Sequence, residues 1–283
     1  MMSRDCLRHS LTDAERDVFE RDGFFFIPNA LTADQVAHYV SAVDDVDAAF
    51  RAKNELRPEE RVNMHDAIGA DPRFLDLIDW PTTFPKVWGL LGWNIQLYHT
   101  QLVVSPQLPP SAKGKRWGWH QDNNRMNRDM EVDLQPRVSL KVLYFLNDIP
   151  TVGMGNFYVL PGSHTTRRLP DPVSEEDPNP GGYVGITARA GDALIFDRRL
   201  WHAASENTSP VTRKVLFYGY SYRWLRPKCD MDVSRVWEGT DPIRRQLLGA
   251  CTTQNGYFDP QPGDVPLKAW IAENTGPGGV VIP

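Results

Sequence analysis

The sequence predicts a mainly β fold, a jelly roll flanked by α-helices that lie mostly at the N-terminal side. Short apolar runs separated by Gly and Pro turns occupy about residues 94–225, whereas capped helical patterns fill about residues 12–92. The 9 Trp, 9 Tyr and 12 Phe suit a β-rich body around an aromatic-lined cavity. We expect one domain over residues 1–283, with a C-terminal helix and tail at 226–283.

The N-terminal part carries two helix-start signals of the same kind. Thr12-Asp-Ala-Glu15 and Thr32-Ala-Asp-Gln35 each place Glu or Gln three residues after Thr, the spacing of a capping box. Between the two expected helices, an apolar run followed by proline indicates a strand. The expected elements are a helix ending at Gly23, a strand at 24–27, an amphipathic helix over 33–52, weakly helical sequence at 53–75 and a short helix at 80–91.

The jelly-roll part is predicted from β-prone runs and the turns between them. Polar or Pro-rich sequence at 105–115, 123–136 and 168–182 indicates surface loops, of which the last two are candidate lids over a site. Asp241-Pro242 indicates a capped helix over 241–248, and the Pro/Gly-rich tail from Asp259 is expected to wrap the surface. The expected strands are 95–104, one through His120, 138–146, 156–160, 183–189, 193–197 and 212–223.

Charge, hydropathy and cysteine usage exclude several functional classes. A net charge of −5, with no basic block, is not typical of a nucleic-acid-binding surface. No stretch approaches the ~18 apolar residues of a membrane span, and no apolar run follows the N-terminus as in a signal peptide. Three widely separated cysteines, Cys6, Cys229 and Cys251, predict free thiols in a reducing cytoplasm.

The stretch Trp117-Gly-Trp-His-Gln-Asp122 contains two potential metal ligands. In a β-strand, alternate side chains share a face, so His120 and Asp122 would project together. A third ligand is available at His202, directly after the apolar run Ala193–Asp197. Two imidazoles and one carboxylate form the donor set of mononuclear non-haem iron(II) sites. The alternatives are an exposed strand-end pair for His120 and Asp122 and a hydrogen-bonded core histidine for His202.

Arg213 points to an anionic ligand. Along the expected strand it shares its face with Val211, Val215 and Phe217, so a guanidinium lies among apolar side chains. A buried charge is costly unless it is paired, and arginine suits bidentate binding of a carboxylate. No acidic residue lies nearby in sequence, which favours a ligand carboxylate. The alternative is an ion pair with a distant Asp or Glu.

Four motifs together resemble the phytanoyl-CoA dioxygenase family of Fe(II)/2-oxoglutarate-dependent oxygenases. They are Trp119–Asp122, the run Gly155–His164 with its Pro-Gly-Ser-His ending, Trp201–Arg213, and Phe19–Pro28 near the N-terminus. The resemblance covers about residues 12–225, and it implies a double-stranded β-helix, the cupin-like jelly roll. The chain departs from the family in having Gly155-Asn156 where Asn-Gly is common, and it shows no feature for handling acyl-CoA.

The resemblance also implies a cofactor, a cosubstrate and their ligands. It makes His120, Asp122 and His202 the ligands of Fe(II), and it pairs Arg213 with the distal carboxylate of 2-oxoglutarate. Gln101 matches a position that often hydrogen-bonds this cosubstrate. O2 is the second cosubstrate. Related halogenases have a small residue in place of the carboxylate, so Asp122 favours hydroxylation of an unactivated C–H.

The expected substrate is a small organic molecule, such as a specialised metabolite. Trp117, Trp119, Asn124 and Tyr218 are the candidate substrate contacts, although packing of the aromatic residues is an alternative for each. Two other functions remain open. They are a different mononuclear metalloenzyme, such as a zinc hydrolase or an isomerase, and a non-catalytic ligand-binding jelly roll; a hydrolase would have no general need for Arg213.

Overall fold

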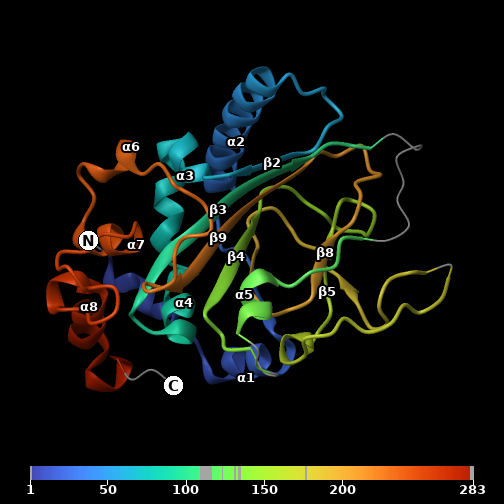
Figure 1. Cartoon of the computed structure of the whole chain (residues 1–283). Coiled ribbons are helices and arrows are strands. Elements are labelled where there is room, and N and C mark those ends of the chain that lie inside the picture. The colour runs from blue at the N-terminus through green and yellow to red at the C-terminus, as the bar shows by residue number, and fades with distance from the viewer. Residues whose placement is uncertain are drawn as a thin grey trace.

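The protein forms two antiparallel β-sheets that face each other, with helices packed on the outer side of the larger sheet (Figure 1). The computed structural model describes residues 2–108, 117–122, 124–130, 132, 135–175 and 177–280. The larger sheet has the order β1-β7-β4-β9-β3-β2, and the smaller has the order β6-β5-β8. This arrangement confirms the jelly roll. The strands are β1 (Phe24–Ile27), β2 (Val62–His65), β3 (Ile95–Ser105), β4 (Ser139–Phe145), β5 (Phe157–Val159), β6 (Val184–Gly185), β7 (Ala193–Asp197), β8 (His202–Ala204) and β9 (Arg213–Tyr222).

The helices begin and end largely where their capping signals predict. Both capping boxes form, with the Thr12 and Thr32 side chains accepting from the third helical backbone N–H. The first helix ends at Gly23, whose φ of 84° is in the left-handed region. The α-helices are α1 (Asp13–Asp22), α2 (Ala33–Asn54), α3 (Ala67–Ala70), α4 (Phe84–Leu91), α5 (Asn124–Asp129), α6 (Ser234–Trp237), α7 (Pro242–Leu247) and α8 (Pro266–Thr275), and the 3-10 helices include η1 (Arg4–His9) and η2 (Pro72–Asp79).

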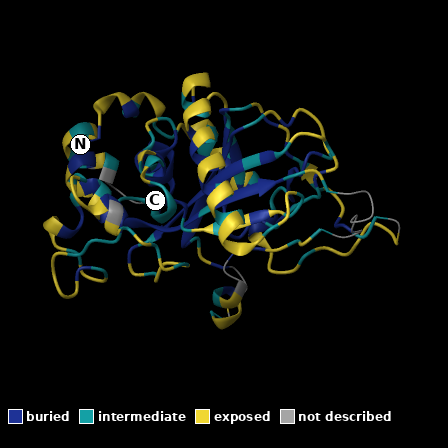
Figure 2. Cartoon of the chain, turned by 90° about the horizontal axis from the view of Figure 1, so that it is seen from above, coloured by how far each residue is buried: buried dark blue, intermediate teal, exposed yellow. Residues whose placement is uncertain are grey.

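Alternation along the strands of the larger sheet separates two hydrophobic cores. On β9, Leu216 and Tyr218 pack into the core under the helices. Val215 and Phe217 pack into a second core between the two sheets. Figure 2 shows α2 exposing its outer face above strands that are buried. The inner face of the larger sheet, the one that carries Arg213, therefore lines the interior of the jelly roll.

Several expected elements were wrong or incomplete. Residues 117–122 form no strand, only an isolated bridge between His120 and His202. The expected loop at 123–136 contains the short helix α5, and the expected surface tail contains α8, which buries Leu267, Trp270 and Ile271. The strand expected at 183–189 is reduced to β6. β2 and β8 were missed because neither run is long enough to show a clear alternation of apolar and polar residues.

Cys6, Cys229 and Cys251 are all free thiols, as their spacing predicts. Within the described ranges, none of the helices combines the length and the apolar character that a membrane crossing requires.

Candidate active site

His120, Asp122 and His202 converge at one end of the jelly roll. The backbones of the two histidines form a bridge, with the His120 N–H donating to the His202 carbonyl (2.9 Å) and the His202 N–H donating to the His120 carbonyl (3.0 Å). The Asp122 N–H donates to the Arg198 carbonyl at 2.8 Å. As a result, one ligand atom from each of the three side chains lies within 4.8 Å of the others. Within the described ranges, this is the one group of His, Cys, Asp or Glu side chains arranged in that way.

Backbone carbonyls orient both imidazoles. Nδ1 of His120 lies 2.8 Å from the Gly118 oxygen, and Nδ1 of His202 lies 2.8 Å from the Leu200 oxygen. A carbonyl can only accept, so each Nδ1 donates to it, and Nε2 is the ring nitrogen that remains to bind a metal. Such a second hydrogen bond is typical of metal-binding histidines. Burial, followed by the neighbouring His120, lowers the pKa of His202 to about 3. The ring of His202 is therefore neutral at ordinary pH.

Asp122 is buried among positive charges. Its carboxylate lies 2.8 Å from the Lys141 ammonium on β4 and 3.5 Å from that of Lys228. Burial alone would raise the pKa of Asp122, but the ammonium groups beside it, Lys141 first and then Lys228, hold it well below its usual value. Asp122 is therefore ionised, which is the form that binds a metal.

A cavity of about 230 Å³ opens beside these three side chains. His120, Lys141, His202, Arg213 and Phe217 are among the residues that line it. A larger cavity of about 630 Å³ lies elsewhere, between the N-terminal segment and the segment that leads into α7. That cavity contains none of the three converging side chains, so we assign the chemistry to the smaller one.

Arg213 is buried in this cavity, and no partner for it is found among the described residues. Its side chain is 1% exposed, its Nε has no hydrogen-bond acceptor, and it forms no ion pair with any residue in the described part of the chain. Burial, followed by the charge of Arg61, lowers its pKa to about 9. Gly155 makes room for it, since a Cβ there would lie 3.3 Å from Arg213 Cδ. This guanidinium is positioned to receive an anion from outside the chain.

Of the other residues predicted to contact ligands, Gln101 lies at the cavity and the two tryptophans do not. Gln101 lines the cavity, and its amide donates to the Asn63 side chain. Trp117 and Trp119 do not line it. The Trp117 ring lies 3.9 Å from that of Tyr158, and the Trp119 indole donates to Asn179 at 2.9 Å. Among the described residues, the two tryptophans anchor the segment that carries His120 and make no contact with the cavity.

Tyr218 is a correction to the sequence-based expectation. It is even-numbered on β9 and therefore faces the helices, opposite Arg213, where its hydroxyl donates to the Phe74 carbonyl at 2.5 Å. The structure excludes it from the lining of the cavity. Asn124 begins α5, but its side chain lies outside the described part of the structure, so its role stays a prediction.

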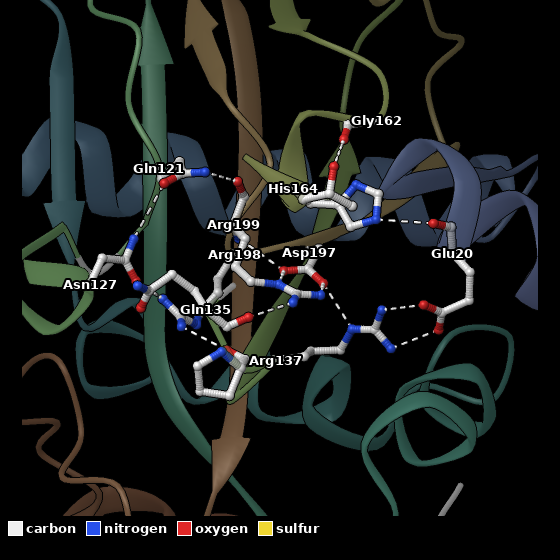
Figure 3. A network of polar contacts seen from close by, with 12 residues as sticks. Glu20, Gln121, Asn127, Gln135, Arg137, Gly162, His164, Asp197, Arg198 and Arg199 are labelled. Carbon is white, nitrogen blue, oxygen red and sulfur yellow. Dashed lines mark hydrogen bonds and ion pairs between the residues drawn. The ribbon is translucent and has the colours of Figure 1, made fainter. Parts of the chain in front are cut away.

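A buried polar network around Asp197 lies next to the segments that carry the three converging side chains (Figure 3). The fully buried Asp197 accepts from Arg199 at 2.7 Å and from Arg137 at 2.8 Å, and Arg137 also pairs with Glu20. Gln121 donates to the Arg199 carbonyl. Gln121 lies between His120 and Asp122, so this hydrogen bond joins the segment that carries both residues to the chain directly after β7.

Sequence reasoning missed three cations near the site. Lys141 and Arg61 line the cavity, and Lys228 reaches Asp122 from the segment after β9. Lys141 could have been found as the one charged residue in the strand sequence Val138–Leu146, which is the same signal that identified Arg213. Nothing local in the sequence points to Arg61 or Lys228.

The donor set fits iron(II) with 2-oxoglutarate. Two Nε2 lone pairs and one ionised carboxylate leave coordination positions free for a chelating cosubstrate. The buried, unpartnered Arg213 in the same cavity supplies the positive charge that a dicarboxylate requires. Three protein ligands with open positions are typical of a catalytic metal site, whereas structural sites are closed.

Comparison with known proteins supports the interpretation of this cavity as a site for iron(II) and 2-oxoglutarate. The family model "Phytanoyl-CoA dioxygenase (PhyH)" matches residues 19–215, more than half of the chain. An ectoine dioxygenase of Nocardia farcinica is 24% identical over 230 residues, covering 70% of this chain and 74% of that protein. An ectoine dioxygenase of Bordetella parapertussis is 25% identical over 231 residues, covering 72% and 73%.

Solved structures share the fold. HygX from Streptomyces hygroscopicus, with nickel and 2-oxoglutarate bound, superimposes with a TM-score of 0.63 at 18% identity and covers 79% of this chain and 92% of its own. SnoK, a non-heme α-ketoglutarate-dependent carbocyclase from nogalamycin biosynthesis, gives a TM-score of 0.59 at 21% identity and covers 80% and 90%. From the family match and the geometry together, the chain belongs to the phytanoyl-CoA dioxygenase family and is an iron(II)- and 2-oxoglutarate-dependent dioxygenase.

Proposed function

We propose that this protein hydroxylates an unactivated C–H bond of a small organic molecule. The substrate, 2-oxoglutarate and O2 would yield the alcohol, succinate and CO2. His120, Asp122 and His202 would bind Fe(II), and Arg213 would bind the distal carboxylate of 2-oxoglutarate. The observation that carries the proposal is that all three ligands and a buried, unpaired arginine line or border one small cavity.

Each side chain has a defined task in this proposal. Bound iron(II) with 2-oxoglutarate would supply the oxidising power for C–H cleavage. Arg213 would orient the cosubstrate through charge-assisted hydrogen bonds. Phe157 and Phe217 line the cavity with apolar surface and would exclude water from the reacting atoms. Lys141 would hold the Asp122 carboxylate in its ionised form.

Two observations favour hydroxylation of a small molecule. A carboxylate at position 122 occupies the place that halogenases leave open, which favours transfer of oxygen to the substrate. The relatives named ectoine dioxygenase and the structural neighbour from nogalamycin biosynthesis support a small-molecule substrate, such as a specialised metabolite. We further propose that residues 1–283 form a single cytoplasmic domain, that Gln101 contacts the cosubstrate, and that loops 123–136 and 168–182 cover the bound substrate.

The test is an anaerobic titration of the metal-free protein with Fe(II) and then 2-oxoglutarate, followed through the visible charge-transfer band of the chelate. We expect the band in the wild type and a loss of 2-oxoglutarate affinity of about 100-fold in Arg213→Ala, as for a buried charge-assisted pair. Arg57→Ala is the control, because Arg57 is an exposed arginine paired with Glu60. Iron binding without a band in the wild type would refute the proposal.

A further inference from the structure

The cavity beside the metal ligands carries more positive charge than one arginine accounts for. Arg61, directly before β2, lines it together with Arg213. Arg61 forms neither an ion pair nor a hydrogen bond with any residue that the structure describes, although it follows Glu59 and Glu60 in sequence. Those two carboxylates pair with Arg57 instead. The cavity therefore holds two guanidinium groups, and no carboxylate is among its lining residues.

Strand register places both arginines on the same inner face. Val62 pairs with Val104, and Ser105 pairs with Arg213. Arg61 precedes Val62, so it lies beside Ser105 on the opposite side of β3 from Arg213. Its two-residue spacing from Asn63, another lining residue, directs its side chain to the same face. Arg61 and Arg213 thus approach the cavity from two neighbours of β3.

Two guanidinium groups that share a small cavity repel each other unless an anion lies between them. The pKa of Arg213 reflects this repulsion, because it is lowered first by burial and then by the positive charge of Arg61. The Arg61 side chain reaches solvent, although the protein around it lowers its pKa by desolvation, whereas Arg213 is buried. Water can solvate Arg61 until a ligand arrives, but the ligand would contact both groups.

We propose that Arg61 is a second cosubstrate-binding residue, which contacts the distal carboxylate of 2-oxoglutarate together with Arg213. This inference rests on the proposed function. A carboxylate has two oxygens and about four lone-pair sites, enough for two guanidinium groups. The Gln101 amide donates to the Asn63 oxygen, so the Asn63 NH2 remains as a further donor on this face. Arg61 would then discriminate in favour of dicarboxylate 2-oxoacids.

The test compares two ligands that differ only at the distal end. 2-Oxoglutarate and 2-oxopentanoate share the chelating 2-oxoacid group, but 2-oxopentanoate ends in a methyl group. Each is titrated anaerobically into the Fe(II)-loaded wild type and Arg61→Gln, and the dissociation constant is read from the charge-transfer band. Because Arg61 is solvent-exposed, we expect Arg61→Gln to weaken 2-oxoglutarate about tenfold. Binding of 2-oxopentanoate should not change.

Controls separate the possible outcomes. Arg8→Gln removes an exposed arginine that pairs with Asp5 outside the cavity, and it should leave the binding of both ligands unchanged. Arg61→Lys keeps the charge and should recover part of the affinity for 2-oxoglutarate. In the double variant with Arg213→Gln, loss of Arg61 should cost less than it does in the wild type, because the shared carboxylate is already poorly held.

Three results would overturn the inference. Unchanged binding of 2-oxoglutarate in Arg61→Gln would remove Arg61 from the cosubstrate site. Equal weakening of both ligands would show a general effect on the metal site and no recognition of the distal carboxylate. A wild type that binds iron but gives no band with 2-oxoglutarate would refute the proposed function itself, and with it this inference.

Discussion

Positively charged side chains have carboxylate partners on one side of the proposed metal ligands and none on the other. Behind them, Arg199 and Arg137 share the buried carboxylate of Asp197 (Figure 3). In front, Arg213 and Arg61 share a cavity that has no carboxylate in its lining. Buried charges are stable when paired within the protein. The presence or absence of a carboxylate partner therefore distinguishes cations that stabilise the fold from cations that are available to bind a ligand.

The largest effect on stability should come from removing the carboxylate of Asp197, which pairs with Arg199 and Arg137. Asp197→Ala leaves the guanidinium groups of Arg199 and Arg137 without their carboxylate, and Arg199 is buried. We expect a loss of about 3–5 kcal/mol in the free energy of unfolding, measured by urea denaturation. The Asp22→Ala control breaks a surface pair with Arg21 and should cost less than about 1 kcal/mol. Equal losses in the two variants would contradict a structural role for the network.

Removal of the unpaired buried cation should separate stability from binding. Arg213→Met takes an unpartnered charge out of the core, so the free energy of unfolding should stay within about 1 kcal/mol of the wild type or rise. The same variant should lose 2-oxoglutarate binding by about 100-fold. Urea denaturation and the anaerobic titration measure the two quantities. A strong destabilisation in the absence of ligand would show that Arg213 has a structural partner.

The stability of the fold should also depend on pH, through the buried His99 and its neighbours Lys141 and Lys228. Burial, then Lys141 and Lys228, lower the pKa of His99 from 6.5 to about 2. Between those values the unfolded chain holds a proton that folded His99 does not. Stability is therefore present above pH 6.5 and falls on acidification, by about 1.4 kcal/mol per pH unit. His99→Gln should remove this contribution from the slope of unfolding free energy against pH, measured between pH 6 and 4 on metal-free protein. A slope identical to that of the wild type would refute the prediction.

The smallest effect should come from the opposite face of β9. Tyr218→Phe removes only the hydroxyl that donates to the Phe74 carbonyl. We expect a loss of about 1 kcal/mol in unfolding free energy and no change in 2-oxoglutarate affinity. A change in affinity would show that the two faces of the strand are not independent.

The sequence was informative about the site wherever chemistry recurs at short spacing. His120 with Asp122, His202 and Arg213 could be singled out because each departs from its local pattern. A contact of Tyr218 with the substrate conflicts with that same pattern, since alternation from Arg213 places Tyr218 on the other face of β9. Arg61, whose place in the cavity depends on pairing between β2 and β3, could not be located without the fold.

The main strands and capped helices were also predictable, because alternation and caps are local properties. β8 and α8 were not. β8 gains its strand geometry only by pairing with β5. α8 begins at Pro266, in Pro/Gly-rich sequence that favours a turn, and its burial of Leu267 and Trp270 is a tertiary effect.

The backbone bridge between His120 and His202 has a consequence for how the protein is made. The two histidines are separated by the chain that forms β4, β5 and β7, so they meet only after those strands have paired. Closure of such a long loop costs entropy before its contacts repay it. The nascent chain would therefore fold first and take up iron afterwards. Metal bound that late in folding should slow unfolding much more than it speeds folding.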